Sequence, residues 1–138
     1  MIFVDGNILI DVWQDDPRWG SWSLEQLGRA ADDGPAAVNA IVVAELSRDF
    51  ASVAEIHDRL AKLDIQSMPI GDAAAFTAGQ RFAAYRKRRQ GIGSPRVLSD
   101  FFIGAHALEL DARLLTRDVA IYAAYFPELT LITPETHS

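Results

Sequence analysis

Four acidic residues lie inside or at the edge of apolar segments of this 138-residue chain: Asp5, Glu45, Asp100 and Asp118. Glu45 interrupts the apolar run 41–46, where an unpaired carboxylate would cost far more to bury than an alkyl chain. Carboxylates that are brought together repel one another unless a cation lies among them. Because hard oxygen ligands without cysteine favour Mg²⁺ or Mn²⁺ over zinc, the pattern predicts a site for one of these ions.

Taken singly, three of these acids also fit purely structural roles. Asp5 with Gly6 is compatible with a turn after a strand. Asp100 and Asp118 are each compatible with the N-cap of a helix, where aspartate is favoured. Glu45 is different, since neither a cap nor a turn explains an acid in the middle of an apolar helix. The conjunction of the four acids therefore carries more weight than any one of them.

Short apolar runs alternate with longer amphipathic segments, which predicts a three-layer α/β/α fold with a mostly parallel sheet. The expected strands are 2–4, 37–39, 65–68, 113–116 and 131–133. Capping boxes are expected at Ser23 with Gln26 and at Ser52 with Glu55, and an N-cap at Asp72. Glycines and proline predict a loop at 91–95. The expected helices are 7–13, one from Ser23 to the Gly34-Pro35 stop, 41–50, 53–63, 72–89, 100–110 and 119–125.

This order of elements places two of the acids at strand ends. Asp5 comes just after the strand 2–4, and Asp118 just after the strand 113–116. In open α/β sheets, ligands bind at the carboxyl ends of the strands, where the strand order reverses. We therefore expect Asp5 and Asp118 to share one pocket, with Asp100 and Glu45 reaching it from apolar helices.

The composition is that of an ordinary globular protein, with 49% hydrophobic and 23% charged residues, and the length predicts one domain over 1–138. The chain has no cysteine, no recognisable secretory signal and no apolar run of the roughly 20 residues that span a bilayer. We therefore expect a cytoplasmic protein without a membrane partner. The three histidines do not form a zinc-binding pattern, and His106 is interpreted as structural.

The net charge of −6 argues at first against a nucleic-acid partner. If bound cations offset the charges of the four acids, however, the net charge of the rest of the chain is −6 + 4 = −2. The most basic run is 86–89 (Arg-Lys-Arg-Arg), with Arg96 close behind, and Arg86, Arg89 and Arg96 are candidates for contacts with a phosphate backbone. The alternative is a basic helix C-terminus that complements the helix dipole.

Four short motifs, in this order along essentially the whole chain, resemble those of the PIN domain. Within that family they resemble the toxin ribonucleases of bacterial toxin–antitoxin pairs, the VapC type. The motifs are Ile-Phe-Val-Asp-Gly-Asn at 2–7, Val-Val-Ala-Glu-Leu at 42–46, Leu-Ser-Asp-Phe-Phe-Ile-Gly-Ala at 98–105 and Leu-Leu-Thr-Arg-Asp at 114–118. The chain departs from the family's motifs at two points. It has Gly6 where many members have Ser or Thr. It also lacks another acid in 119–121, which leaves the number of metal ions open.

The resemblance implies metal-dependent hydrolysis of RNA to 5′-phosphate and 3′-hydroxyl ends. In this hypothesis Asp5, Asp100 and Asp118 hold the ion, which activates a water molecule. Glu45 binds metal through water or orients the attacking water. Asn7 and Thr116 are candidates for hydrogen bonds that orient the carboxylates, although Thr116 equally fits an ordinary strand residue.

The resemblance also implies a homodimer and a cognate antitoxin that covers the site. Trp13, Trp19 and Trp22 fit part of that partner surface, because aromatic residues are enriched in interfaces, and they fit core packing equally well.

Other classes of protein fit the chain less well. A phosphatase wants a second aspartate where Asn7 stands, and a receiver domain wants an acidic pair and a late lysine. A catalytically silent PIN-fold binding module would be favoured by the loss of an acid, and none is lost. The same residues are compatible with DNA as the substrate.

Overall fold

The computed structural model describes residues 1–91 and 97–138. Its five strands form one sheet in the order β3-β2-β1-β4-β5. The four pairings between neighbouring strands are all parallel. The predicted α/β fold with a parallel sheet is therefore confirmed. The strands are β1 (Ile2–Val4), β2 (Ala36–Val38), β3 (Ile65–Ser67), β4 (Arg113–Leu115) and β5 (Leu131–Ile132).

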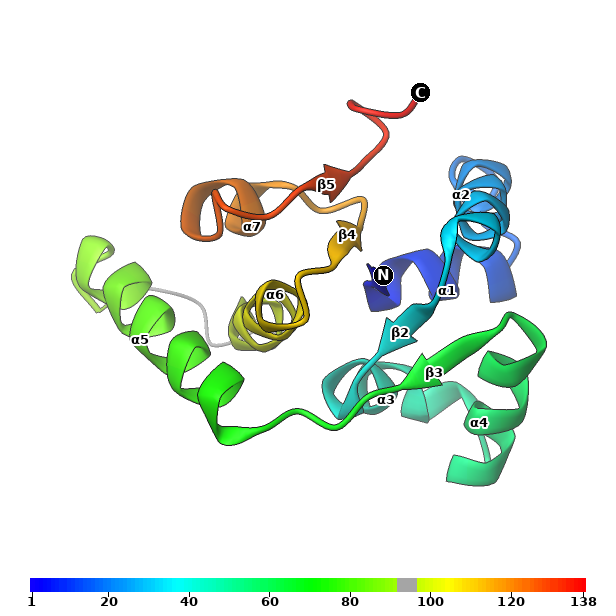
Figure 1. Ribbon diagram of the computed structural model, residues 1–138, viewed down its shortest axis with the longest axis horizontal. Coiled ribbons are helices and arrows are strands. Elements are labelled where there is room, and N and C mark those ends of the chain that lie inside the picture. Colours follow the sequence, from blue (N-terminus) through cyan, green and yellow to red (C-terminus); the bar gives the residue numbers. More distant parts are fainter. Residues whose placement is uncertain (92–96) are drawn as a thin grey trace.

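Helices cover both sides of this sheet. Figure 1 shows α1 and α2 on one side of the row of strands and α5, α6 and α7 on the other, which gives the three predicted layers. No helix in the described ranges is long and apolar enough to cross a membrane. The helices are α1 (Gly6–Trp13), α2 (Gly20–Asp33), α3 (Ala40–Leu46), α4 (Val53–Lys62), α5 (Asp72–Arg88), α6 (Leu98–Glu109) and α7 (Ala120–Tyr125), with a 3-10 turn η1 (Ser47–Asp49) after α3.

The central strand β1 lies where the strand order reverses. From β1 the chain proceeds outward through β2 to β3, and then returns to place β4 on the other side of β1. Phe3 and Val4 are fully buried, and Val4 pairs with Leu115. The carboxyl ends of β1 and β4 therefore lie side by side at the position where ligands bind in such sheets.

Aromatic side chains join α6 to the outer helices. Phe101 of α6 packs against Phe82 and Tyr85 of α5, with ring centroids 5.4 Å and 5.6 Å apart. On its other side it packs against Phe126, just after α7, at 5.7 Å. Because Phe101, Phe126 and Tyr85 are buried, this cluster fixes α6, which carries one of the four acids, against its neighbours.

Of the two predicted capping boxes, one is confirmed for its serine cap only, because Glu55 Oε2 accepts from the backbone N–H of Ala51 at 3.1 Å and not from that of Ser52, and the other is wrong. Ser52 caps α4, since its Oγ accepts a hydrogen bond from the backbone N–H of Glu55 at 3.2 Å. Ser23, in contrast, lies inside α2 and is fully buried. Its Oγ donates to Asp11 Oδ2 at 2.9 Å, so the serine serves a tertiary contact that the local sequence pattern could not predict.

Other boundaries move by one to four residues. Helix α3 ends at Leu46, so the helix predicted to reach Phe50 is too long, and Phe50 is extended with φ −131°. Gly71 holds the N-cap position of α5 and Asp72 is its first residue. Of the predicted loop 91–95, only Gly91 belongs to the described residues, and it has a positive φ of 81°.

Gly104 provides a test of this packing. A Cβ atom at this position of α6 would lie 2.8 Å from Cδ2 and Cε2 of Phe126, whose ring is buried and cannot move away freely. We expect Gly104→Ala to destabilise the protein by about 1–3 kcal/mol through overpacking. Gly79→Ala at an exposed position of α5, where a Cβ meets nothing within 4 Å, should instead stabilise it by about 0.5–1 kcal/mol. Urea unfolding measures both, and equal stability of Gly104→Ala and the wild type would contradict the packing described.

Candidate functional site

Asp5 is a buried acid that follows the central strand directly. Its side chain is 3% exposed, and it stands at the N-cap position of α1 without capping that helix through its carboxylate. Its Oδ2 atom instead accepts hydrogen bonds from Thr116 Oγ1 at 2.8 Å, Tyr122 OH at 2.9 Å and Asn7 Nδ2 at 3.4 Å. Burial raises the pKa of Asp5 in spite of these donors, and the charge of Asp118 raises it further.

Asn7 and Thr116 join the ends of β1 and β4 around Asp5. Asn7 Oδ1 accepts from the backbone N–H of Arg117 at 3.3 Å, which leaves its amide NH₂ group to face Asp5 and Thr116. Thr116 Oγ1 donates to Asp5 and accepts from the backbone N–H of Asp118 at 3.0 Å. Both residues named from the sequence therefore contact the carboxylate or the segment that follows it.

Asp100 and Asp118 lie close to Asp5 but are not N-caps. Val97 holds the N-cap position of α6 and Val119 that of α7, so the capping alternative is wrong for both acids. Burial raises the pKa of the half-buried Asp100 to about 7, and the charges of Asp5 and Asp118 add to this rise. Asp118 itself is exposed and follows β4.

Glu45 reaches the same place from α3. The residue is exposed overall, yet its Oε1 lies only 3.0 Å from the point that a Cβ on Gly6 would occupy. Partial burial of the carboxyl group, followed by repulsion from Asp5 and Asp100, raises the pKa of Glu45 to about 7. The close approach also explains the glycine, since a larger residue at position 6 would have to displace the Glu45 carboxylate. The structure thus brings all four acids into one electrostatic cluster.

The cluster fits a divalent cation in donor type and charge. None of its four acids forms an ion pair with a lysine, arginine or histidine of the described chain. Within residues 1–91 and 97–138, no three acidic or histidine side chains converge closely enough to enclose an ion as they stand. Carboxylates without cationic partners, three of them (Asp5, Glu45 and Asp100) with raised pKa values, suit Mg²⁺ or Mn²⁺, which would draw the carboxylates inward.

Three residues beside this cluster, Tyr122, Arg117 and Asp11, could not be identified from the sequence. Tyr122 is fully buried, donates to Asp5 and has its hydroxyl 3.4 Å from Asp100 Oδ1. Arg117 forms a two-point ion pair with the buried Asp11, at 2.5 Å from Nε to Oδ2 and 2.9 Å from Nη2 to Oδ1. This pair anchors the segment between Thr116 and Asp118. No local pattern marks these residues, because their partners lie far away in the sequence.

His106 has the structural role expected for it. It is buried, and its Nδ1 lies 3.0 Å from Asn39 Nδ2. Asn39 Oδ1 accepts from the backbone N–H groups of Ile41 and Val42, so its amide NH₂ group donates to a neutral imidazole. Burial lowers the pKa of His106, which agrees with that neutral state.

The three tryptophans divide into two contacts. Trp13 packs on Phe50, with ring centroids 5.3 Å apart, and Trp19 on Trp22 at 6.5 Å. Trp13 and Trp22 are partly buried against the core, which supports core packing for these two.

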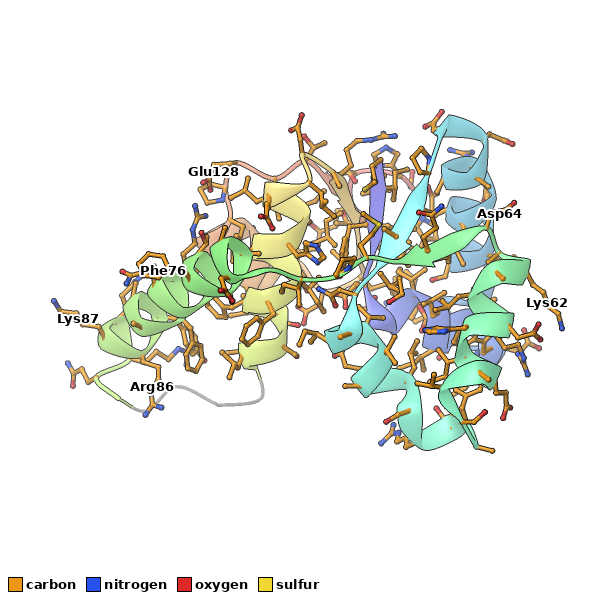
Figure 2. All side chains as sticks on the ribbon, turned by 60° about the horizontal axis from the view of Figure 1, so that its bottom comes forward. Lys62, Asp64, Phe76, Arg86, Lys87 and Glu128 are labelled. Atoms are coloured by element: carbon orange, nitrogen blue, oxygen red, sulfur yellow. The ribbon has the colours of Figure 1, made fainter. Side chains whose placement is uncertain are left out.

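The basic run lies at the end of α5. Figure 2 shows Arg86 and Lys87 projecting outward there, and all four residues of the run are exposed. Arg89 and its neighbour Arg88 line a groove of about 300 Å³ between α5 and α7. The groove extends to Ala120, two positions after Asp118, whereas Arg96 lies outside the described residues.

Comparisons with known proteins agree with this architecture. A family model described as the PIN domain matches residues 2–127. No curated protein sequence matches the chain significantly. Among solved structures, a chain of VapBC2 from Rickettsia felis, bound to a promoter DNA fragment, is similar with a TM-score of 0.66 and 21% identity, covering 96% of this chain and 98% of that one. VapBC-1 from nontypeable Haemophilus influenzae is similar with a TM-score of 0.67 and 19% identity, covering 96% of this chain and 98% of that one. A chain of a toxin–antitoxin complex from Klebsiella pneumoniae is similar with a TM-score of 0.60 and 22% identity, covering 97% of this chain and 98% of that one.

The raised pKa values make the metal-free fold sensitive to pH. Asp5, Glu45 and Asp100 hold protons in the folded state at pH values where they are ionised in the unfolded chain. Stability therefore falls as pH rises from the unfolded values near 4 to about 7. We expect the melting temperature in chelator to fall between pH 5 and 8, and to fall less in Asp100→Asn. Asp58→Asn, at an exposed position of α4, should behave as the wild type does, and an identical slope in all three proteins would contradict the cluster.

Proposed function

The chain belongs to the PIN domain family, and we propose that it is a metal-dependent endoribonuclease that acts as a toxin and is neutralised by a cognate antitoxin. The observation that carries this proposal is the cluster of Asp5, Glu45, Asp100 and Asp118, four acids without cationic partners in the described chain, at the reversal point of a parallel sheet. Such a cluster destabilises the metal-free protein, so a binding role explains its presence better than a structural one.

Each acid has a distinct proposed task. Asp5, Asp100 and Asp118 would hold Mg²⁺ or Mn²⁺, which when bound supplies an activated water molecule and offsets charge on the phosphoryl oxygens. Glu45, whose carboxyl faces the other acids from α3, would orient the attacking water. Asn7 and Thr116 keep the Asp5 carboxylate oriented through the hydrogen bonds described above.

The proposed substrate is RNA, and the products of its cleavage would carry 5′-phosphate and 3′-hydroxyl ends. Arg86, Arg89 and Arg96 are the proposed contacts with its backbone. The exposure of Arg86 and Arg89, and the groove from Arg89 toward the start of α7, support this assignment for the first two. A DNA substrate is the alternative that the same metal chemistry allows.

The similar solved structures support the proposed partners. VapBC complexes and a toxin–antitoxin complex share this fold over nearly the whole chain. We therefore propose a cognate antitoxin that covers the acidic cluster. A homodimer and action in the cytoplasm are further proposals, which rest on the motifs and composition of the sequence. A silent PIN-fold binding module is less favoured, because all four acids are present and gathered.

Asp100→Asn tests the metal-dependent reaction. The exchange keeps the shape of the side chain and removes one charge, so the fold should remain while a metal ligand is weakened. We expect wild-type protein with Mg²⁺ or Mn²⁺ to cleave single-stranded RNA, excess chelator to abolish cleavage, and Asp100→Asn to lower kcat/KM by at least about 100-fold, a loss of about 2.7 kcal/mol in transition-state stabilisation. Asp58→Asn is the matched control and should cleave normally.

The same variants separate the proposed function from its alternatives. Growth arrest on expression of the wild type, relieved by Asp100→Asn at equal protein level, is the result expected of a toxin. Cleavage of RNA that persists in excess chelator would contradict the metal site. Cleavage of DNA but not of RNA would show that DNA is the substrate. Full activity of Asp100→Asn would show that Asp100 is not part of the metal site.

The basic run is tested by the salt dependence of RNA binding. We expect the double variant Arg86→Ala, Arg89→Ala to bind single-stranded RNA more weakly and to flatten the slope of log K against log salt by about 0.7 for each lost phosphate contact. Lys62→Ala provides the control, because Lys62 lies on the far side of the molecule on α4 (Figure 2). A slope equal to that of the control would show that these arginines do not contact the RNA backbone and only complement the dipole at the C-terminus of α5.

A further inference from the structure

We propose that Tyr122 is a positioning residue that fixes the Asp5 carboxylate so that the site accepts one divalent ion. This inference rests on the proposed function, since it concerns how the metal site is built. It answers a question that the motifs left open, because the chain lacks a further acid directly after Asp118.

The geometry places the Tyr122 hydroxyl between two of the acids. Tyr122 comes from α7 and is fully buried. Its hydroxyl lies 2.9 Å from Asp5 Oδ2 and 3.4 Å from Asp100 Oδ1. A phenol has a single proton to donate, so the shorter contact marks Asp5 as its acceptor. A buried tyrosine needs such a partner, and here that partner is a carboxylate of the site itself.

Three donors occupy one oxygen of Asp5. Oδ2 receives the hydroxyl groups of Thr116 and Tyr122 and, at a longer distance, the amide of Asn7. A carboxylate oxygen has about two lone-pair sites, so Oδ2 has none left for a metal ion. No side chain of the described residues donates to Oδ1. The backbone N–H of Gly6 is a further donor to the Asp5 carboxylate, and Oδ1 retains a lone pair for the ion.

This division of the carboxylate limits the number of ions. In two-metal sites the ions lie about 3.5–4 Å apart, and a shared carboxylate commonly gives one oxygen to each ion. Asp5 is the buried acid of the cluster: the Tyr122 hydroxyl lies between it and Asp100, and Glu45 Oε1 approaches Gly6, the residue after Asp5. With Oδ2 held by Tyr122 and Thr116, Asp5 presents one oxygen to a metal ion, which favours a single ion over a pair bridged through both oxygens of Asp5.

Binding of Mn²⁺ to the metal-free full-length protein, measured by electron paramagnetic resonance of the free ion, tests the inference without any assay of activity. We expect the wild type to bind one Mn²⁺ per chain. Tyr122→Phe removes only the hydroxyl and should bind Mn²⁺ about tenfold more weakly, as is typical when a group that orients a ligand is lost. Thr116→Val, which removes the other hydroxyl from the same oxygen, should weaken binding in the same way. Tyr125→Phe, on the same helix, should bind as the wild type does.

Thermal melting in chelator identifies whether each variant is folded, so that weak binding is not mistaken for unfolding. A folded Tyr122→Phe protein with wild-type affinity would overturn the role of Tyr122. Two Mn²⁺ ions per wild-type chain would overturn the single-ion site. A wild-type protein that binds no Mn²⁺ would overturn the proposed function and this inference with it, which distinguishes that failure from the other two.

Discussion

The buried carboxylate of Asp5 is the constraint around which the neighbouring elements are arranged. A carboxylate withdrawn from water needs hydrogen-bond donors or a cation to compensate for its lost hydration. The donors come from the first turn of α1, from the end of β4 and from α7. The parallel register that pairs Val4 with Leu115 puts Asp5 beside Thr116, so the sheet itself aligns acid and donor.

The remaining acids are then held close to a charge that is already poorly solvated. Helix α6 brings Asp100, and α3 brings Glu45 against the space left open by Gly6. Only part of this charge is compensated within the described chain, because the Asp11–Arg117 ion pair lies beside the cluster and not in it. Repulsion between these neighbouring carboxylates destabilises the metal-free protein, and proteins retain such local destabilisation where a bound ligand relieves it.

Much of this arrangement could be predicted from the sequence. The alternation of strands and helices gave the parallel sheet, and the strand ends at Asp5 and Asp118 could be located because apolar runs stop there. Glu45 stood out for its apolar context. Tyr122 and the Asp11–Arg117 pair could not be predicted, because their partners are more than 100 residues away in the sequence. Ser23 was misassigned for a related reason, since a contact with Asp11 takes the place of the helix cap its local sequence suggests.

A crystal grown with Mn²⁺ tests most directly whether these carboxylates bind a divalent cation. Anomalous scattering at the manganese edge locates the ion without reference to any assay. We expect one strong peak per chain, in contact with Asp5 Oδ1 and within coordination distance of Asp100 and Asp118. Density for ordered acids with no anomalous peak among them, at a Mn²⁺ concentration that supports RNA cleavage, would contradict this expectation.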